Sequence, residues 1–225
     1  MRGLSFPLAR GLALILDMDG VVLNSNPIHR EAWAAFNRRY GLETTGAMHE
    51  FMYGKRNDAI IRGFFGEELT EEEVRSRGAA KEALYREMVG DRLEDLLVPG
   101  VRQFLEGYPG TPKALATNAE PENVDFLLDR AGLRRHFAVV VNGHMVGNPK
   151  PHPEIYLRTS DLLEVAPANC IVFEDSHAGV ASALSAGMRV LGLRTTHEDL
   201  PGTILDVDNF LSGELYKWLG SQSPV

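Results

Sequence analysis

Short apolar stretches alternate with amphipathic ones along much of the chain, and this alternation predicts most of the secondary structure. The first apolar stretch, 12–16, holds five apolar residues without a charge, which is typical of a strand buried on both faces of a parallel sheet. Four similar stretches predict further strands at 114–116, 139–141, 170–173 and 189–193. Apolar residues spaced three and four apart predict helices at 121–131, 154–163, 178–186 and 210–219.

The segment between the first two predicted strands shows no strand pattern, and we expect it to be helical. Asn26 is a good N-cap for a first helix that Gly41 closes. A capping box at Thr70 marks the start of a longer helix. The helices predicted after the first are 56–65 and 70–88. We therefore expect an inserted α-helical cap domain at 25–98 and an α/β core domain at 1–24 and 99–225.

The order of the predicted elements indicates the architecture of the core. Strands that alternate with helices imply right-handed crossovers, and hence a doubly wound parallel sheet with helices on both faces. Ligands of such sheets bind beyond the carboxyl ends of the strands. Asp17, Thr117 and Asp175 each come at the end of an apolar strand. We therefore expect one crevice to collect these three side chains.

Composition and charge exclude several kinds of protein. The chain has 225 residues, of which 44% are hydrophobic and 24% charged, as in ordinary globular proteins. Its formal net charge of −8 argues against a nucleic-acid partner. The single cysteine, Cys170, lies in an apolar run, so we interpret it as a core residue in a reducing compartment. No apolar run is long enough to span a membrane, and the start is too short for a signal peptide before the first strand. We expect a cytoplasmic monomer with no membrane partner.

Two carboxylates at the end of the first strand point to chemistry. Asp17 and Asp19 are two residues apart, so on an extended backbone their side chains leave on the same side. Gly20 then allows a turn where a side chain would crowd. Two anions this close repel each other unless a cation or a shared proton compensates them. An ordinary acidic turn at the end of a strand is the alternative interpretation.

Further polar groups complete a set of residue types that phosphoryl transfer requires. A carboxylate can attack phosphorus and form an aspartyl-phosphate, provided that a cation such as Mg²⁺ reduces the repulsion. A hydroxyl and a lysine can hold the phosphoryl oxygens, while a second acid protonates the leaving group. The chain supplies these groups in four pieces, which are Asp17-Met18-Asp19-Gly20, Thr117-Asn118, Lys150 and Glu174-Asp175.

In this order and on these strands, the four pieces resemble the haloacid dehalogenase superfamily, in its subfamily with an α-helical cap. The resemblance covers nearly the whole chain and implies that Asp17 is the nucleophile and a Mg²⁺ ligand. It implies that Asp19 is the general acid and base, with its backbone carbonyl on the metal. The remaining core roles that it implies are phosphoryl binding by Thr117, Asn118 and Lys150, and completion of the Mg²⁺ site by Asp175, with Glu174 either a further ligand or a residue that orients the others. Val21 and Pro149 depart from the usual pattern without removing a charged participant.

The predicted cap is most similar to that of the β-phosphoglucomutase group and of related sugar phosphatases. His29, twelve residues after Asp17, falls at that group's histidine near the hinge. Lys81 matches its Lys-x-x-x-Tyr pattern, and Arg56 resembles its cap arginine but comes one residue early. The resemblance therefore gives His29, Arg56 and Lys81 roles in substrate binding. The alternative is that all three are ordinary exposed or capping residues.

These observations predict Mg²⁺-dependent phosphoryl transfer through an aspartyl-phosphate, with hydrolysis of a small sugar phosphate or a related phosphometabolite. The alternative is isomerisation of a sugar phosphate of the β-phosphoglucomutase type. A dehalogenase dispenses with the metal and the second aspartate, and a phosphonate hydrolase has a different residue at the position of Asp19. A non-catalytic binding protein on the same fold remains a further alternative, against which the complete set of core residues argues.

Overall fold

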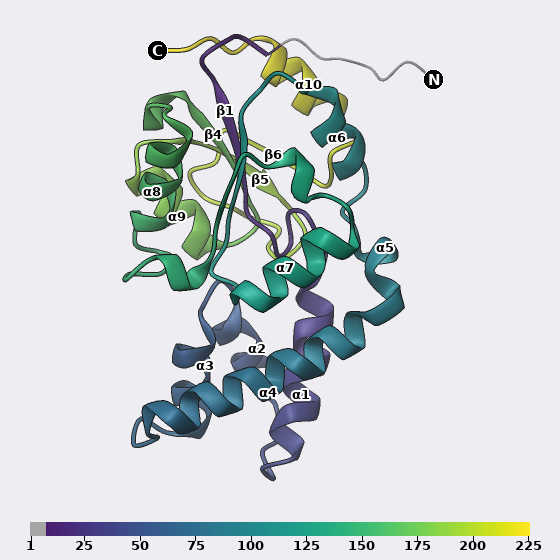
Figure 1. The fold of residues 1–225 in the computed structure, drawn as a ribbon, viewed down its shortest axis with the longest axis vertical. Coiled ribbons are helices and arrows are strands. Elements are labelled where there is room, and N and C mark those ends of the chain that lie inside the picture. Colours follow the sequence, from purple (N-terminus) through teal and green to yellow (C-terminus); the bar gives the residue numbers. More distant parts are fainter. Residues whose placement is uncertain (1–7) are drawn as a thin grey trace.

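A parallel sheet of six strands forms the centre of the computed structural model, which describes residues 8–225 (Figure 1). Across the sheet the strands lie in the order β3-β2-β1-β4-β5-β6, so the first strand is central. Leu14 pairs with Lys113 of β2 on one side and with Ile171 of β4 on the other. This confirms the predicted doubly wound parallel sheet. The strands are β1 (Ala13–Leu16), β2 (Lys113–Ala116), β3 (Val139–Val141), β4 (Cys170–Glu174), β5 (Arg189–Leu193) and β6 (Leu205–Val207).

Helices cover both faces of the sheet, and the alternation of side chains along β1 explains why (Figure 1). Leu14 and Leu16 pack into the core beneath one set of helices, which are α6 (Val101–Gly107), α7 (Pro121–Arg130) and α10 (Gly213–Gly220). Ala13 and Ile15 pack on the opposite face, beneath α8 (Glu154–Leu163) and α9 (His177–Ser185). Because successive side chains of a strand point to opposite faces, a strand covered on both sides is apolar throughout.

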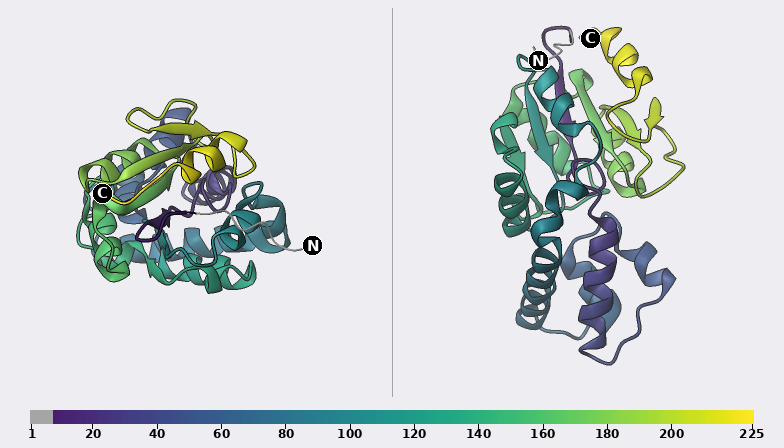
Figure 2. Two further views of the ribbon diagram at one scale, coloured as in Figure 1. Left: turned by 90° about the horizontal axis from the view of Figure 1, so that it is seen from above. Right: turned by 90° about the vertical axis from the view of Figure 1, so that its right-hand side faces the viewer.

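The inserted segment forms a helical cap beyond the carboxyl ends of the strands (Figure 2). It packs around a small apolar core of its own that includes Trp33, Phe36 and Ile61. The predicted capping box is present, because the Glu73 carboxylate accepts from Thr70 N and Thr70 Oγ1 accepts from Glu73 N. The cap helices are α1 (Asn26–Arg38), α2 (Gly46–Met52), α3 (Asn57–Phe65) and α4 (Glu71–Val89).

The two chain segments that join the cap to the core lie side by side. Asn24 N donates to Leu96 O at 2.7 Å, and Val98 N donates to Val22 O at 3.1 Å. These contacts lie at the predicted boundaries, although the division into two domains stays a prediction. The remaining short elements are α5 (Leu93–Leu96) and the 3₁₀ helices η1 (Gly90–Arg92), η2 (Arg134–His136), η3 (Gly143–Met145) and η4 (Pro167–Asn169).

Several local expectations differ from the structure. Asn26 is not an N-cap, because Ser25 holds that position and the Asn26 amide donates to Asp175 Oδ2 at 3.2 Å instead. The last helix begins at Gly213, three residues later than predicted, since Ser212 caps it and Phe210 is buried in the core. Four elements are too short to show a clear period in the sequence, namely α2, α5, α6 and β6. Within residues 8–225, no helix has both the length and the apolar character that crossing a bilayer requires.

Candidate active site

The carboxyl ends of β1, β2 and β4 meet at the end of the sheet that faces the cap (Figure 1). Asp17 follows β1, Thr117 follows β2 and Asp175 follows β4. Because these strands are neighbours, the three side chains line one cavity between the core and the cap. Asp19, Asn118 and Lys150 line the same cavity. The structure thus brings together the core residues that the sequence analysis named.

Lys150 is a buried cation held between two carboxylates. Its Nζ donates to Asp17 Oδ1 at 2.7 Å, to Glu174 Oε1 at 2.6 Å and to the Ala116 carbonyl at 2.9 Å. Burial by itself would lower the pKa of Lys150, but the negative charges of Asp17 and Glu174 outweigh it and raise the pKa. The ammonium group is therefore a permanent positive charge beside Asp17.

Asp17 is buried beside two other carboxylates, and Lys150 compensates the cost of ionising it only in part. Burial raises the pKa of Asp17 from its ordinary 3.8 to about 7, with Glu174 and Asp19 adding to the rise and Lys150 opposing it. Burial, followed by the charges of Glu174 and Asp17, also raises the pKa of Asp175 well above its ordinary value. Raised pKa values mean that the ionised forms of these carboxylates are disfavoured, and a bound cation would stabilise those ionised forms.

Asp175 is held on one side and approached closely on the other. Its Oδ2 accepts hydrogen bonds from the Asn26 amide, at 3.2 Å, and from the Thr196 hydroxyl. Gly20 has a φ of +80°, and a Cβ at this position would lie 1.8 Å from Asp175 Oδ2. The turn after Asp19 therefore needs glycine for its backbone conformation and for its space.

Glu174 is fully buried, and both of its carboxylate oxygens are engaged. Oε1 accepts from Lys150 and from the Tyr156 hydroxyl at 2.6 Å. Oε2 accepts from the backbone N–H groups of Asp175 and Ser176 and from the Ser176 hydroxyl. A Cβ on Gly179 of α9 would lie 1.9 Å from this carboxyl group, so glycine at this position leaves the space that the Glu174 side chain occupies. The five donors suit a carboxylate that positions Lys150 and Asp175.

Carboxylate oxygens of Asp17, Glu174 and Asp175 lie within 4.8 Å of one another. Hard divalent cations such as Mg²⁺ prefer carboxylate and carbonyl oxygens. The donor set and the raised pKa values of Asp17 and Asp175 therefore fit a divalent cation. Both carboxylate oxygens of Glu174 already accept hydrogen bonds, whereas the bonds described above engage only Oδ1 of Asp17 and Oδ2 of Asp175.

Asp19 lies on the cap side of the turn and is held by residues at the start of α1. Its Oδ1 accepts from the Ser25 hydroxyl, and His29 Nε2 lies 3.4 Å from the same oxygen. Burial opposes ionisation of Asp19, but the hydrogen bonds and charges of its neighbours, chiefly His29, outweigh burial and lower its pKa. Asp19 is thus ionised in this arrangement.

His29 connects Asp19 to the cap helix α4. Lys81 Nζ lies 3.2 Å from His29 Nδ1, and the His29 ring stacks on Tyr85 with a centroid separation of 3.8 Å. An ammonium group has only donors, so Nδ1 accepts and the other ring nitrogen, Nε2, carries the hydrogen that faces Asp19. Lys81 is buried, and its ammonium also pairs with the neighbouring Glu82.

Thr117 and Asn118 form the wall beside Lys150. The Thr117 hydroxyl accepts from Ala119 N at 3.1 Å. Asn118 accepts from Lys150 N at 3.3 Å and donates to the Gly54 carbonyl of the cap at 2.8 Å. Asn118 therefore connects the core to the cap loop as well as lining the cavity.

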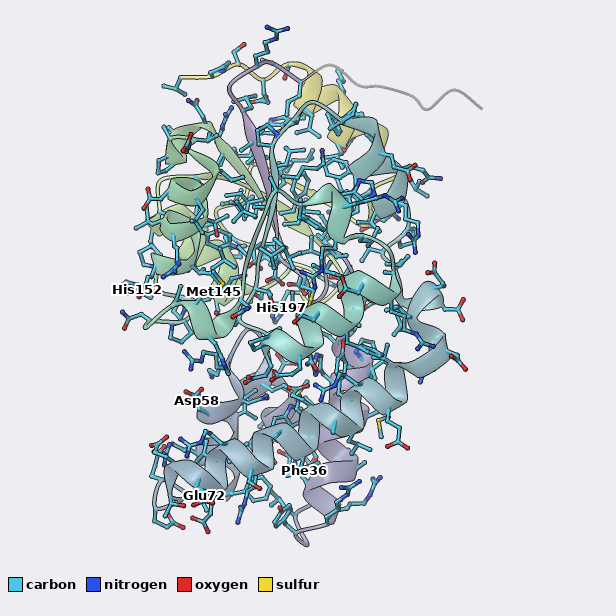
Figure 3. All side chains as sticks on the ribbon, in the orientation of Figure 1. Phe36, Asp58, Glu72, Met145, His152 and His197 are labelled. Carbon is cyan, nitrogen blue, oxygen red and sulfur yellow. The ribbon has the colours of Figure 1, made fainter. Side chains whose placement is uncertain are left out.

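Arg56 is the predicted site residue that the structure does not bring into the cavity. Its guanidinium lies 3.5 Å from the carboxylate of Asp58, an exposed residue on the cap (Figure 3). Its two neighbours, Lys55 and Asn57, line the cavity in its place. The predicted role of Arg56 in substrate binding therefore finds no support in its position.

Several residues near the site escaped the sequence analysis. Asn26 had the pattern of an N-cap, and Tyr156 had that of a core residue on α8. Thr196 lies three residues beyond the end of β5, whereas Thr117 directly follows β2, so its position after a strand did not single it out. His197, the next residue, lies near the boundary between core and cap (Figure 3). Its ring packs edge-on against that of Tyr53, with a centroid separation of 5.7 Å.

Comparisons with known proteins agree with this geometry. A model of the haloacid dehalogenase-like hydrolase family matches residues 12–187. The chain is 32% identical over 187 residues to a fructose-1-phosphate phosphatase of Escherichia coli, covering 82% of this chain and 97% of the relative. It is 33% identical over 188 residues to a phosphorylated carbohydrates phosphatase of Thermotoga maritima, covering 80% of this chain and 84% of the relative.

The fold also matches solved structures. A crystal structure of β-phosphoglucomutase from Clostridium difficile superposes with a TM-score of 0.81 at 26% identity, covering 92% of this chain and 96% of that one. The resemblance to capped, sugar-phosphate-processing members of the superfamily is thereby confirmed, as is the expectation of an enzyme of the phosphatase type.

Proposed function

This chain belongs to the haloacid dehalogenase-like hydrolase family, and on that premise we propose that it hydrolyses a small sugar phosphate or a related phosphometabolite through an aspartyl-phosphate on Asp17. The observation that carries the proposal is the position of Asp17, whose buried carboxylate opens on the cavity and contacts Lys150 at 2.7 Å. The names of the two phosphatase relatives support sugar phosphates as the substrate class.

In the first half of the reaction, a carboxylate oxygen of Asp17 attacks phosphorus and the bond to the leaving oxygen breaks. Lys150, Thr117 and Asn118 hold the phosphoryl oxygens as negative charge spreads over them. Asp19 is ionised before the substrate binds, so it first takes up a proton from solvent and then donates that proton to the leaving oxygen. Its bonds to Ser25 and His29 disfavour protonation, so we expect Asp19 to exchange these partners when the substrate enters.

In the second half, a water molecule attacks the phosphorus of the aspartyl-phosphate. Asp19 removes a proton from that water, and the bond between phosphorus and Asp17 breaks to release phosphate. The low pKa of Asp19 suits this step, because the carboxylate is ionised. His29 Nε2, which lies 3.4 Å from Asp19 Oδ1, positions the ionised carboxylate for this second half.

We propose that Mg²⁺ is the cation of the site, held by Asp17, Asp175 and the backbone carbonyl of Asp19. When bound, it reduces the repulsion between the attacking carboxylate and the phosphate. Glu174 positions Lys150 and Asp175 through its hydrogen bonds rather than ligating the ion. A monomer located in the cytoplasm belongs to the same proposal and rests on the sequence.

The contacts of two cap cations, Lys81 and Arg56, favour hydrolysis over a phosphoglucomutase reaction. A mutase binds the far end of a phosphorylated sugar tightly enough to keep water from its aspartyl-phosphate. Lys81 is instead paired with Glu82, and Arg56 faces Asp58 outside the cavity. Transfer to water therefore has less competition from the sugar.

The test is phosphate release from 4-nitrophenyl phosphate and from a panel of sugar phosphates, with Mg²⁺ and with chelator. Asp17→Asn keeps the size of the side chain but removes the nucleophile, so we expect turnover to fall by at least about a thousandfold. Asp161→Asn, which changes an exposed carboxylate on α8, is the matched control and should retain full activity. An Asp17→Asn protein that keeps a tenth of the activity rules out the proposed mechanism. Isomer formation that outpaces phosphate release from β-glucose 1-phosphate supports a mutase instead.

A further inference from the structure

The wall of the cavity opposite Lys150 consists of residues from the cap and from the start of α7. Among the described residues of this wall, four are charged: Lys55, Lys81, Glu82 and Glu120. Their charges cancel, so this end of the cavity has no excess of positive charge. It therefore differs from the opposite end, where Lys150 and the carboxylates that would hold Mg²⁺ line the cavity.

The two lysines of this wall are already engaged. Lys81 is buried and pairs with Glu82, and its ammonium also lies 4.8 Å from the centre of the Trp33 ring. Lys55 is exposed, and its ammonium lies 3.6 Å above the Phe51 ring. Lys81 is therefore neutralised by a carboxylate, whereas the contact of Lys55 is with an aromatic ring.

Glu82 is the buried centre of the wall. Its Oε1 accepts from the Asn57 amide at 2.8 Å, and its Oε2 accepts from the Asn123 amide at 2.6 Å. Arg86 donates a hydrogen bond to Oδ1 of the same Asn123 at 2.7 Å. Contacts from the cap helices and from α7 thus hold a carboxylate, rather than a cation, on the wall where the proposed function places the distal part of the substrate.

The charges and hydrogen-bonding groups of this wall favour some distal groups of a substrate over others. A carboxylate and two amides can exchange hydrogen bonds with sugar or polyol hydroxyls, which donate as well as accept. A second phosphate is an anion at neutral pH, and burying it requires cations, whereas Lys81 is paired with Glu82 and Lys55 lies on the Phe51 ring. The negative charge of Glu82 opposes it further.

We infer that Glu82 makes the enzyme selective for monophosphates with an uncharged, hydroxyl-bearing distal end and causes it to reject bisphosphates. This inference rests on the proposed function for the placement of the reacting phosphate at Lys150. It adds the class of the distal group and a residue that determines it.

The test measures affinity in an Asp17→Asn background, so that it does not depend on turnover. Mannitol 1-phosphate and mannitol 1,6-bisphosphate are titrated with Mg²⁺ by calorimetry, because this pair differs by the distal phosphate alone and the two ends of mannitol are equivalent. We expect the monophosphate to bind at least about tenfold more tightly. Glu82→Gln leaves Lys81 without a charged partner and should reduce this preference by about tenfold. Glu87→Gln, on the exposed face of the same helix, removes the same charge from the protein and should leave the preference unchanged.

Asn57→Arg keeps the Glu82 side chain but replaces the amide that donates to it with a cation, and it should favour the bisphosphate even if Glu82→Gln does not fold. Equal affinity for the two compounds in the parent protein overturns the inference, as does binding of neither. A preference that Glu82→Gln and Glu87→Gln leave equally unchanged overturns the role of Glu82. Absence of phosphate release from the wild-type chain, with the affinity pattern intact, contradicts the proposed function and leaves this inference standing.

Discussion

The Tyr156 hydroxyl donates to Glu174 Oε1 at 2.6 Å, beneath the floor of the active site. The same oxygen accepts from Lys150, whose ammonium also lies 4.9 Å from the centre of the Tyr156 ring. Tyr156 therefore contacts both members of the ion pair between Lys150 and Glu174. It does so from α8, an element whose pattern indicated nothing but packing.

Tyr156→Phe removes this hydroxyl and leaves the ring in place. Because a buried carboxylate then lacks one donor, we expect unfolding to become easier by about 1.5–3 kcal/mol. We also expect kcat to fall several-fold with little change in KM, since the contact of Lys150 with the phosphoryl group strengthens in the transition state. Denaturant unfolding and steady-state kinetics measure the two effects. Tyr40→Phe, at a side chain that is 49% exposed, is the control, and equal behaviour of the two variants contradicts the role of Tyr156.

Two glycines with similar backbone angles offer a matched test of space at the site. Gly20 has a φ of +80°, and Gly41 has a φ of +70°. A Cβ at Gly20 would meet Asp175 Oδ2 at 1.8 Å, whereas a Cβ at Gly41 meets nothing within 4 Å. We expect Gly41→Ala to cost about 1 kcal/mol from the backbone alone.

Gly20→Ala carries the same backbone cost and displaces Asp175 as well. We expect it to destabilise the protein by at least about 2 kcal/mol more than Gly41→Ala and to weaken activation by Mg²⁺. Chemical unfolding gives the first quantity, and the Mg²⁺ concentration for half-maximal activity gives the second. If both variants need the same Mg²⁺ concentration as the wild type, Asp175 is not a ligand in the way proposed.

Asp19→Asn separates the two halves of the reaction. General acid–base groups contribute about 10²- to 10⁴-fold, and we expect steady-state turnover to fall within that range. An activated leaving group such as 4-nitrophenolate needs little protonation, so the aspartyl-phosphate should still form and then decay slowly. Rapid-mixing kinetics should therefore show a burst of 4-nitrophenol. Equal loss of formation and decay indicates that Asp19 has another role.

The raised pKa of Asp17 predicts how metal-free stability depends on pH. Its folded pKa of about 7 exceeds the ordinary 3.8, so between these values the folded chain binds more protons than the unfolded one. The contribution of Asp17 to the free energy of unfolding therefore falls as pH rises through this window. Asp17→Asn removes this contribution, so in chelator we expect the Tm of the variant to gain on the wild type between pH 5 and pH 8.

Mg²⁺ should oppose the same effect, because a ligand that binds only the folded state stabilises it. The Tm of the wild type should rise more on addition of Mg²⁺ at pH 8 than at pH 5, where protons compete with the ion. Asp161→Asn serves again as the exposed control. Parallel melting curves of wild type and Asp17→Asn across this pH range contradict the assignment of the buried, cation-dependent carboxylate to Asp17.

The sequence by itself determined the features that depend on neighbours along the chain. The apolar run before Asp17 predicted the central strand, and Thr70 with Glu73 predicted the start of α4. The place of Asp17, Thr117 and Asp175 at the ends of strands was enough to bring them together, because parallel strands align their carboxyl ends. Hydrophobic period and helix capping depend on residues close together in the sequence, and the crossovers of a parallel sheet depend on the order of its elements. A single sequence therefore contains the information needed to predict them.

The tertiary structure alone decided which partners these groups have. Asn26 is a helix-capping residue by its sequence, yet it contacts Asp175, which lies 149 residues further along the chain. Lys81 lies on a charged helix, yet it is 1% exposed and paired. Burial and hydrogen-bond partners depend on how distant elements pack, and local patterns carry no information about those distances. For the same reason only the folded chain reveals that Glu82, on the same helix, faces the cavity.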